Sequence, residues 1–211
     1  MNATCDIPGL GLAINPGDFP AARFDPPPAE GTTEETAVLA GGCFWCTEAV
    51  FKELDGVLSV TPGYSGDDAA SADYRTVCSG STNHAEAISI RFDPRRISYA
   101  GLLKVFFAVA HDPTQVDRQG EDTGRQYRSA IFHADERQRD IAQRYIDQLA
   151  EGGVFKSPIA TEVVPLEAFH VAEAYHHDYA ARNPAQPYIA AVARPKVEKL
   201  QHTFGGLLKG E

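Results

Sequence analysis

Two cysteines separated by two aromatic residues are the groups in this chain best suited to chemistry. They lie in Ala40-Gly-Gly-Cys-Phe-Trp-Cys-Thr-Glu48, directly after an apolar run. The run suits a short buried strand over residues 36–40, the paired glycines permit a sharp turn, and residues 47–54 have helical spacing. Cys43 is therefore expected where a helix begins, and there the free N–H groups and the helix dipole favour a thiolate. The motif predicts a reactive thiol.

Cys46 follows one helical turn later, so both sulfurs are expected on the same side of the helix. Because a reactive thiolate is also readily oxidised, a neighbouring thiol can resolve the oxidised species into a transient disulfide. The alternative is a zinc half-site, although no second Cys-x-x-Cys or His-x-x-x-His motif follows. Phe44 and Trp45 are either core residues or an apolar wall beside the thiol, suited to a small group such as a methyl.

Glu86 is the candidate proton donor. Over residues 84–92 the chain alternates so that Glu86 shares one strand face with Ile88 and Ile90. Desolvation would raise its pKa, and a protonated carboxyl group can donate to a developing oxyanion. A structural carboxylate with a buried partner is the alternative. Tyr74 and Tyr127 are candidate hydrogen-bond donors to the same oxygen, although either could serve packing alone.

Other titratable groups receive less prominent assignments. His176, His177 and Asp178 are expected in solvated or capping roles, because neighbours on a helix face different ways. Cys78 is expected as a small buried hydrophobe, and Cys5 as an exposed thiol.

The order of elements predicts an α+β fold. Beyond the first strand and helix, strands are expected over 57–64, 84–92, 127–132 and 161–165, with helices over 98–110 and from Asp135 to Gly152. Residues 73–80 look looser. This order favours a two-layer sandwich of a mixed or antiparallel sheet with helices, with a ferredoxin-like core and long irregular tails. Residues 1–34 are expected as an extended or flexible arm, and residues 35–211 as one catalytic domain with a C-terminal tail packing on it.

Composition narrows the partners and the compartment. The chain carries 19 Lys and Arg against 29 Asp and Glu, a formal charge of −10. It has no basic cluster or cationic amphipathic face, which argues against nucleic acid and membranes as partners. Four cysteines are too few for a disulfide scaffold, and no signal segment is visible. We expect a soluble cytoplasmic monomer.

Taken together, these residues resemble the A-type peptide-methionine sulfoxide reductases, which are specific for the S epimer. The first block is Gly42-Cys-Phe-Trp45 with Glu48. The later blocks follow in that family's order: Gly63-Tyr64, Tyr74-Arg75 with Val77-Cys-Ser-Gly80, His84-Ala-Glu-Ala87, His111-Asp-Pro113, Gln119-Gly120, Asp122, Gly124 and Gln126-Tyr-Arg-Ser129. The resemblance spans about residues 37–190 and is far more specific than any single block.

The resemblance implies a protein-repair enzyme that acts under oxidative stress on methionine sulfoxide, free or in proteins. Cys43 would attack the sulfur, and Glu86 would protonate the oxygen with help from Tyr74 and Tyr127. Phe44 and Trp45 would receive the methyl group, and Asp122 would position substrate or water. The sulfenic acid on Cys43 would then become a disulfide that thioredoxin reduces. Neither a metal nor an organic cofactor is implied.

The chain departs from the common family form in its recycling thiols. Many members carry resolving cysteines in a C-terminal tail, but no cysteine follows Cys78 here. Cys46 becomes the first candidate resolver, ahead of Cys5 and Cys78, and direct reduction of the sulfenic acid stays open. The rival class is a thiol–disulfide oxidoreductase acting on protein disulfides. A thiol hydrolase with His84 as base and a zinc-stabilised binding module explain fewer of these residues.

Overall fold

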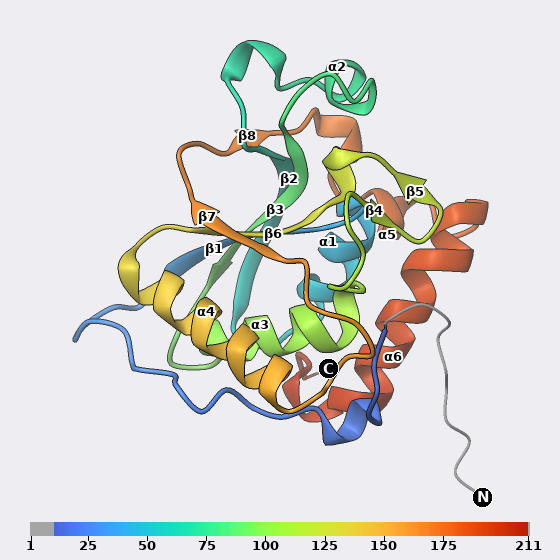
Figure 1. Cartoon of the computed structure of the whole chain (residues 1–211). Coiled ribbons are helices and arrows are strands. Elements are labelled where there is room, and N and C mark those ends of the chain that lie inside the picture. Colours follow the sequence, from blue (N-terminus) through green and yellow to red (C-terminus); the bar gives the residue numbers. More distant parts are fainter. Residues whose placement is uncertain (1–10, 211) are drawn as a thin grey trace, which may run out of the picture.

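The computed structural model describes residues 11–210, and a six-stranded sheet lies at its centre (Figure 1). The strand order is β7-β6-β1-β3-β2-β8. Their bounds are Glu35–Gly41 (β1), Val57–Ser65 (β2), Ala85–Phe92 (β3), Ser129–His133 (β6), Glu162–Pro165 (β7) and His170–Val171 (β8). A separate two-stranded ribbon consists of Arg118–Gln119 (β4) and Asp122–Thr123 (β5).

The four middle strands have the ferredoxin-like arrangement. β1 pairs antiparallel with both β3 and β6, and β2 pairs antiparallel with β3. Because the chain runs β1-α1-β2-β3-α3-β6, this pairing reproduces the split βαβ order. β7 adds to β6 in parallel and makes the sheet mixed. The expected α+β fold with a mixed sheet is confirmed.

Helices pack on the sheet (Figure 1), and apolar side chains of the helices and the sheet together form the principal hydrophobic core. The α-helices are Phe44–Lys52 (α1), Tyr74–Cys78 (α2), Tyr99–Val105 (α3), Glu136–Glu151 (α4), Tyr179–Arg182 (α5) and Arg194–Phe204 (α6). Two π-helical turns, Phe106–Ala110 (η3) and Ile189–Ala193 (η6), continue α3 and precede α6. Short 3₁₀ turns occur at Pro16–Asp18 (η1), Ala69–Ser71 (η2), Arg125–Tyr127 (η4), Ala174–His176 (η5) and Gly205–Leu207 (η7).

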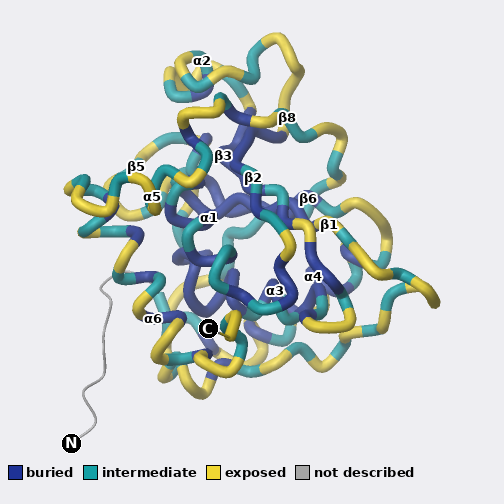
Figure 2. The backbone as a smooth tube through the Cα atoms, turned by 180° about the vertical axis from the view of Figure 1, so that it is seen from behind, coloured by how far each residue is buried: buried dark blue, intermediate teal, exposed yellow. Residues whose placement is uncertain are grey.

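The two sheet faces bury different sets of side chains. Leu39, Ile88 and Ile131 belong to the large core shared with the helices. Their sequence neighbours belong to a smaller cluster with the chain around Leu166 and Phe169. The four middle strands, β6, β1, β3 and β2, therefore lie in the buried interior of the molecule (Figure 2). The alternation expected along β3 is confirmed, since Ile88, Ile90 and Phe92 face the large core and Ala85 and Ala87 face the smaller one.

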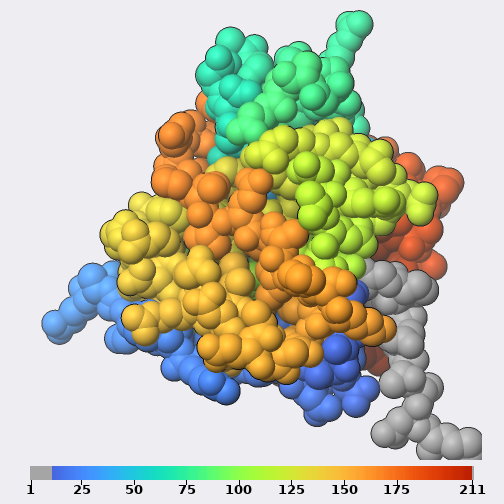
Figure 3. Space-filling model, in the orientation of Figure 1, coloured from blue at the N-terminus to red at the C-terminus, as the bar shows by residue number. Residues whose placement is uncertain are grey.

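The described part of the N-terminal segment runs along the lower edge of the molecule beside α4 (Figure 3). The Tyr145 hydroxyl donates to the Pro20 carbonyl at 2.6 Å, and Gln148 bonds both Ala21 and Arg23 through backbone groups. These contacts hold residues 20–23 against the helix. Cys5, which was expected to be exposed, lies outside the described residues.

Two local expectations were wrong. Residues 74–78 form the short helix α2 rather than a loose segment, because the Asp73 side chain caps it by accepting from the Thr76 N–H at 3.0 Å. Tyr127 lies in η4 and not in a strand, because Gly124 turns the chain at φ +129° and β6 begins only at Ser129. The second change takes Tyr127 out of regular sheet structure and into a turn that contacts β3.

Candidate active site

Cys43 stands at the N-cap of α1, directly after the turn that ends β1. Two glycines are required there. A Cβ on Gly41 would lie 3.0 Å from the Phe106 ring, and one on Gly42, whose φ is +84°, would lie 2.7 Å from the Gln119 Cβ. The close approach and the left-handed φ explain why only glycine fits between strand and thiol. The expected helix start at Cys43 is confirmed.

Buried polar groups support this turn from behind. His111 lies 2.6 Å from the Ser129 hydroxyl through Nε2 and 3.0 Å from the Phe106 carbonyl through Nδ1. Burial lowers the pKa of His111 to about 3, so its ring is neutral at physiological pH. Gln119 is held by two hydrogen bonds to the Asp112 backbone. These side chains position the turn and do not line the cavity beside the thiol.

A cavity of about 200 Å³ opens beside Cys43. It gathers residues from α1, α2, β3, β5 and η4, which are far apart in the chain. Its lining residues are Cys43, Phe44, Trp45, Tyr74, Glu86, Asp122, Tyr127, Gln186 and Tyr188. Seven of the eight site residues expected from the sequence therefore line one cavity. The eighth, Cys46, is fully buried behind it.

Glu86 projects from β3 and is almost completely buried, at 2% exposure. Its Oε2 accepts the Phe44 N–H at 3.0 Å, which joins the carboxyl group to the first turn of α1. Burial raises the pKa of Glu86 to about 8, and the charges of Asp122 and Cys46 act in the same direction, whereas the Phe44 N–H opposes them. At neutral pH the group is mostly protonated and can donate a proton into the cavity.

Tyr74 and Tyr127 contribute two hydroxyl groups to the same cavity. Burial raises the pKa of both, and the nearby Glu86 adds to the effect, so both remain hydrogen-bond donors. Cys78 is only half-buried and hydrogen-bonds with the two tyrosines. Its expected role as a buried hydrophobe is wrong, because its sulfur lies in this polar cluster.

The aromatic pair after Cys43 packs against the C-terminal segment. Trp45 stacks on Tyr179 with ring centroids 3.9 Å apart, and its Nε1–H donates to Nδ1 of His176 at 3.1 Å. Phe44 is buried between Tyr64 and His176, at centroid distances of 5.8 and 5.0 Å. The expectation that His176 is solvated or caps a helix is wrong. It is 1% exposed and fixes the indole ring at the cavity wall.

The two thiols differ in a way that the sequence did not indicate. Cys43 and Cys46 are hydrogen-bonded to each other. Burial raises the pKa of Cys43, and Cys46 and Glu86 reinforce this. The hydrogen bond from Cys43 is the main cause that lowers the pKa of Cys46 to about 7. The expectation that the helix start favours the thiolate of Cys43 is wrong for the resting site, because desolvation outweighs the helix dipole.

Tyr188 links the buried thiol to the cavity. Its hydroxyl oxygen lies 3.8 Å from the Cys46 sulfur, and the hydroxyl group donates to the Asp122 carboxylate. Sequence reasoning missed Tyr188 and Gln186, which belong to the segment between α5 and η6. That segment has no helical or strand periodicity, so no local signal pointed to either residue.

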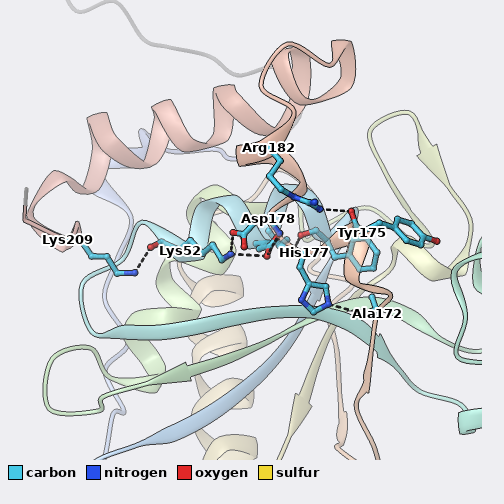
Figure 4. Close-up of polar contacts among 10 residues, drawn as sticks. Lys52, Ala172, Tyr175, His177, Asp178, Arg182 and Lys209 are labelled. Carbon is cyan, nitrogen blue, oxygen red and sulfur yellow. Dashed lines mark hydrogen bonds and ion pairs between the residues drawn. The ribbon is translucent and has the colours of Figure 1, made fainter.

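Hydrogen bonds and ion pairs between α1 and the chain around Asp178 hold the C-terminal segment beside the site (Figure 4). The Glu48 carboxylate accepts the Asp178 N–H at 3.0 and 3.1 Å, and Lys52 bonds both Glu48 and the Asp178 side chain. Lys209 also donates to the Lys52 carbonyl at 2.7 Å. The C-terminal tail does not lie only on the surface of the domain, because Leu200 and Phe204 belong to the main hydrophobic core.

Groups that the rival interpretations need lie elsewhere. The His84 ring bonds to the Asp68 carbonyl at 3.0 Å and does not line the cavity. Within residues 11–210, no group of three or more His, Cys, Asp or Glu side chains is arranged to hold a metal ion. Over the same residues, no helix combines the length and apolar character needed to span a membrane.

Comparison with known proteins identifies relatives along most of the chain. Residues 35–206 match the family described as "Peptide methionine sulfoxide reductase". A Synechocystis protein named MsrA 2 of that description is 49% identical over 96% of this chain and 100% of its own length. A Thermus thermophilus MsrA is 52% identical over 83% of this chain and 98% of its own. The reduced form of Saccharomyces cerevisiae Mxr1 superposes with a TM-score of 0.66 at 27% identity, covering 81% of this chain and 96% of Mxr1.

Proposed function

The chain belongs to the peptide methionine sulfoxide reductase family, an oxidoreductase family that reduces methionine sulfoxide, and we propose that its cavity acts on the S epimer, free or in proteins. The thiolate form of Cys43 attacks the sulfoxide sulfur while Glu86 gives a proton to the sulfoxide oxygen. Methionine leaves, and the oxygen remains on Cys43 as a sulfenic acid. The observation that carries this proposal is the buried Glu86 carboxyl group in the same small cavity as the Cys43 thiol.

The remaining lining residues suit the shape and charge of a sulfoxide. Tyr74 and Tyr127 keep their protons and can donate to the oxygen as negative charge develops on it. Phe44 and Trp45 supply apolar surface for the methyl group. Asp122, held by Tyr188, can accept a hydrogen bond from substrate or from an incoming water.

We assign recycling to Cys46. Its sulfur attacks Cys43, the S–S bond forms, and the sulfenic oxygen leaves as water. The lowered pKa of Cys46 supports this role, because thiolate is available near neutral pH. Since Cys46 is buried and both residues begin the same helix, the first turn of α1 has to loosen. Thioredoxin is the proposed reductant and the cytoplasm the proposed compartment, because the cycle must return both thiols to the reduced state.

The test is a thiol count after a limited reaction. The enzyme is reduced, freed of reductant, and given R or S methionine sulfoxide. We expect one methionine formed and two thiols lost per enzyme with the S epimer, and neither with the R epimer. The Cys46→Ser variant should form one methionine and lose only the Cys43 thiol. Equal reaction of both epimers would overturn the stereochemical assignment, and loss of two thiols by Cys46→Ser would overturn the resolver.

A thiol–disulfide oxidoreductase is the second candidate, because a Cys-x-x-Cys pair with an acidic thiol begins a helix. The acidic thiol is Cys46, however, and its 1% exposure keeps a protein disulfide from reaching it. Reduction of insulin disulfides separates the two functions. A methionine sulfoxide reductase should not reduce insulin. Reduction of insulin at a rate that does not depend on Glu86 would favour the thiol–disulfide oxidoreductase.

A further inference from the structure

Lys196 is a buried cation that the reaction described above does not use. It lies in the first turn of α6 and is only 8% exposed. None of the carboxylates within residues 11–210 forms an ion pair with it. Burying an ammonium group is costly unless a nearby negative group compensates it. Its burial therefore favours a neighbouring group that can carry negative charge.

The position of Lys196 identifies that group as Cys46. Cys46 forms one buried cluster with Ile189 and with Ala193, which is the N-cap of α6. Lys196 follows Ala193 by three residues on the same helix and so occupies the same face. Side chains on a helix lean toward its N-terminus, which brings the Lys196 stem back over Ala193 and toward the thiol. α6 packs against both α1 and η3, and Lys196 therefore lies in the interior between them.

We propose that Lys196 is a positioning residue that keeps negative charge on Cys46 and so prepares this sulfur to attack the sulfenic acid of Cys43. The proposal rests on the assignment of Cys46 as the resolving thiol. In the step concerned, the Cys46 thiolate forms the S–S bond as the S–O bond on Cys43 breaks. The oxygen takes a proton from Glu86 or solvent and leaves as water.

The groups facing Cys46 show why a cation is needed. In the resting enzyme, Cys43 and Tyr188 hydrogen-bond to Cys46, and Lys196 adds positive charge, whereas the charge of Asp122 opposes ionisation. Glu86 also lies within electrostatic range of this sulfur. Once Cys43 has become a sulfenic acid, the proton of its thiol is gone. Lys196 then remains to stabilise the attacking thiolate.

The neighbourhood of Lys196 contains a second titratable ring, which does not compete for this role. The positive charge of Lys196 contributes, after burial, to the low pKa of His111. His111 is neutral and is engaged by Phe106 and Ser129 on both ring nitrogens. It neither neutralises the ammonium group nor donates to Cys46.

The direct test titrates Cys46 in the Cys43→Ser background, in which it is the thiol of the pair that remains. Thiolate absorbance and site-resolved alkylation are followed against pH. Lys196→Met should raise the midpoint by about one pH unit, the low end of the effect of a neighbouring charge. Lys196→Arg should restore it. Lys199→Met is the matched control, because Lys199 is also buried on α6, and it should leave the midpoint in place.

A kinetic readout uses the enzyme with Cys43 intact and follows loss of the second thiol after one turnover with the S sulfoxide. A rise of one unit in the pKa of Cys46 lowers its thiolate fraction about tenfold at pH 6. The more basic thiolate is also about threefold more nucleophilic, which partly compensates for this loss. Disulfide formation in Lys196→Met should therefore be about threefold slower at pH 6. At pH 9 both enzymes are ionised, and the variant should be about twofold to threefold faster. A purely structural defect would not reverse sign with pH.

An unchanged midpoint in Lys196→Met, or slowing by the same factor at pH 6 and pH 9, would overturn the proposal. Should Lys196→Met fail to fold by circular dichroism, Lys196→Gln removes the charge while keeping a polar head group, and the same criteria apply. A wrong assignment of Cys46 as the resolving thiol would give a different result from a wrong role for Lys196. If Cys46 is not the resolver, the unaltered enzyme itself loses only one thiol per methionine formed.

Discussion

Replacing Glu86 by Gln should lower the activity of the enzyme and raise its stability at neutral pH. The exchange keeps the size of the side chain and its acceptor for the Phe44 N–H, but it removes the acidic proton. With a pKa of about 8, roughly nine in ten Glu86 side chains are protonated at pH 7. Loss of a positioned proton donor costs about 10²-fold to 10⁴-fold in rate. Single-turnover formation of methionine should fall by that factor in Glu86→Gln.

The same pKa fixes the pH dependence of the unaltered enzyme. Glu86 acts in its protonated form, which is present below pH 8 and lost above it. The protonated fraction of Glu86 falls about tenfold between pH 7 and pH 9, so the ratio of the first-turnover rate of the unaltered enzyme to that of Glu86→Gln should fall with it, because the ionisation of Cys43 is common to both. Glu86→Asp retains an acid and should retain a decline, whereas Glu86→Gln should show no ionisation from this position.

Stability should change the other way. In the unfolded chain the Glu86 carboxyl group titrates near its ordinary 4.5, whereas in the folded protein its pKa is about 8. Between these values the folded state binds more protons, so stability falls as pH rises from 4.5 to 8. The loss reaches up to about 3 kcal/mol at pH 7. Glu86→Gln removes this penalty and should be more stable at pH 7, with a smaller gain at pH 5, in urea unfolding.

Two results would refute this reasoning. An unchanged first-turnover rate in Glu86→Gln would show that Glu86 donates no proton and serves only to hold Phe44. A variant that is less stable than the parent by the same amount at pH 5 and pH 7 would show that the carboxyl group is not held protonated by burial.

Three further substitutions test the thiol pair and the turn that carries it. Cys46→Ser should form one methionine per enzyme and then stall with thioredoxin as reductant, and steady turnover would contradict its role. Tyr188→Phe removes the hydroxyl group between Cys46 and Asp122, and should slow second-thiol loss severalfold in stopped-flow thiol assays. Gly42→Ala should cost about 2 kcal/mol or more in thermal unfolding and lower activity, whereas Gly120→Ala, also at positive φ but with open space around it, should cost about 1 kcal/mol and leave activity intact.

Features that depend on local pattern were readable from the sequence. The alternation over residues 84–92 placed Glu86 on the core face of β3, because side chains alternate strictly along a strand. The glycine pair before Cys43 marked the strand-to-helix turn, because few other residues permit it. The order of strands and helices indicated an α+β sandwich with a mixed or antiparallel sheet, since short connections allow few topologies.

The tertiary structure decided which thiol is acidic and what surrounds it. From the local sequence, the helix dipole was expected to lower the pKa of Cys43. In the folded protein, burial beside Glu86 raises the pKa of that thiol. The neighbouring helix α6 carries Lys196, whose charge lowers the pKa of Cys46. Tyr188 and His176 reach α1 across more than 100 residues of chain. Desolvation and charge proximity depend on which distant segments pack together, and no periodicity within a short stretch encodes that. Sequence alone therefore proposed the candidate reacting groups, whereas tertiary packing sets their protonation.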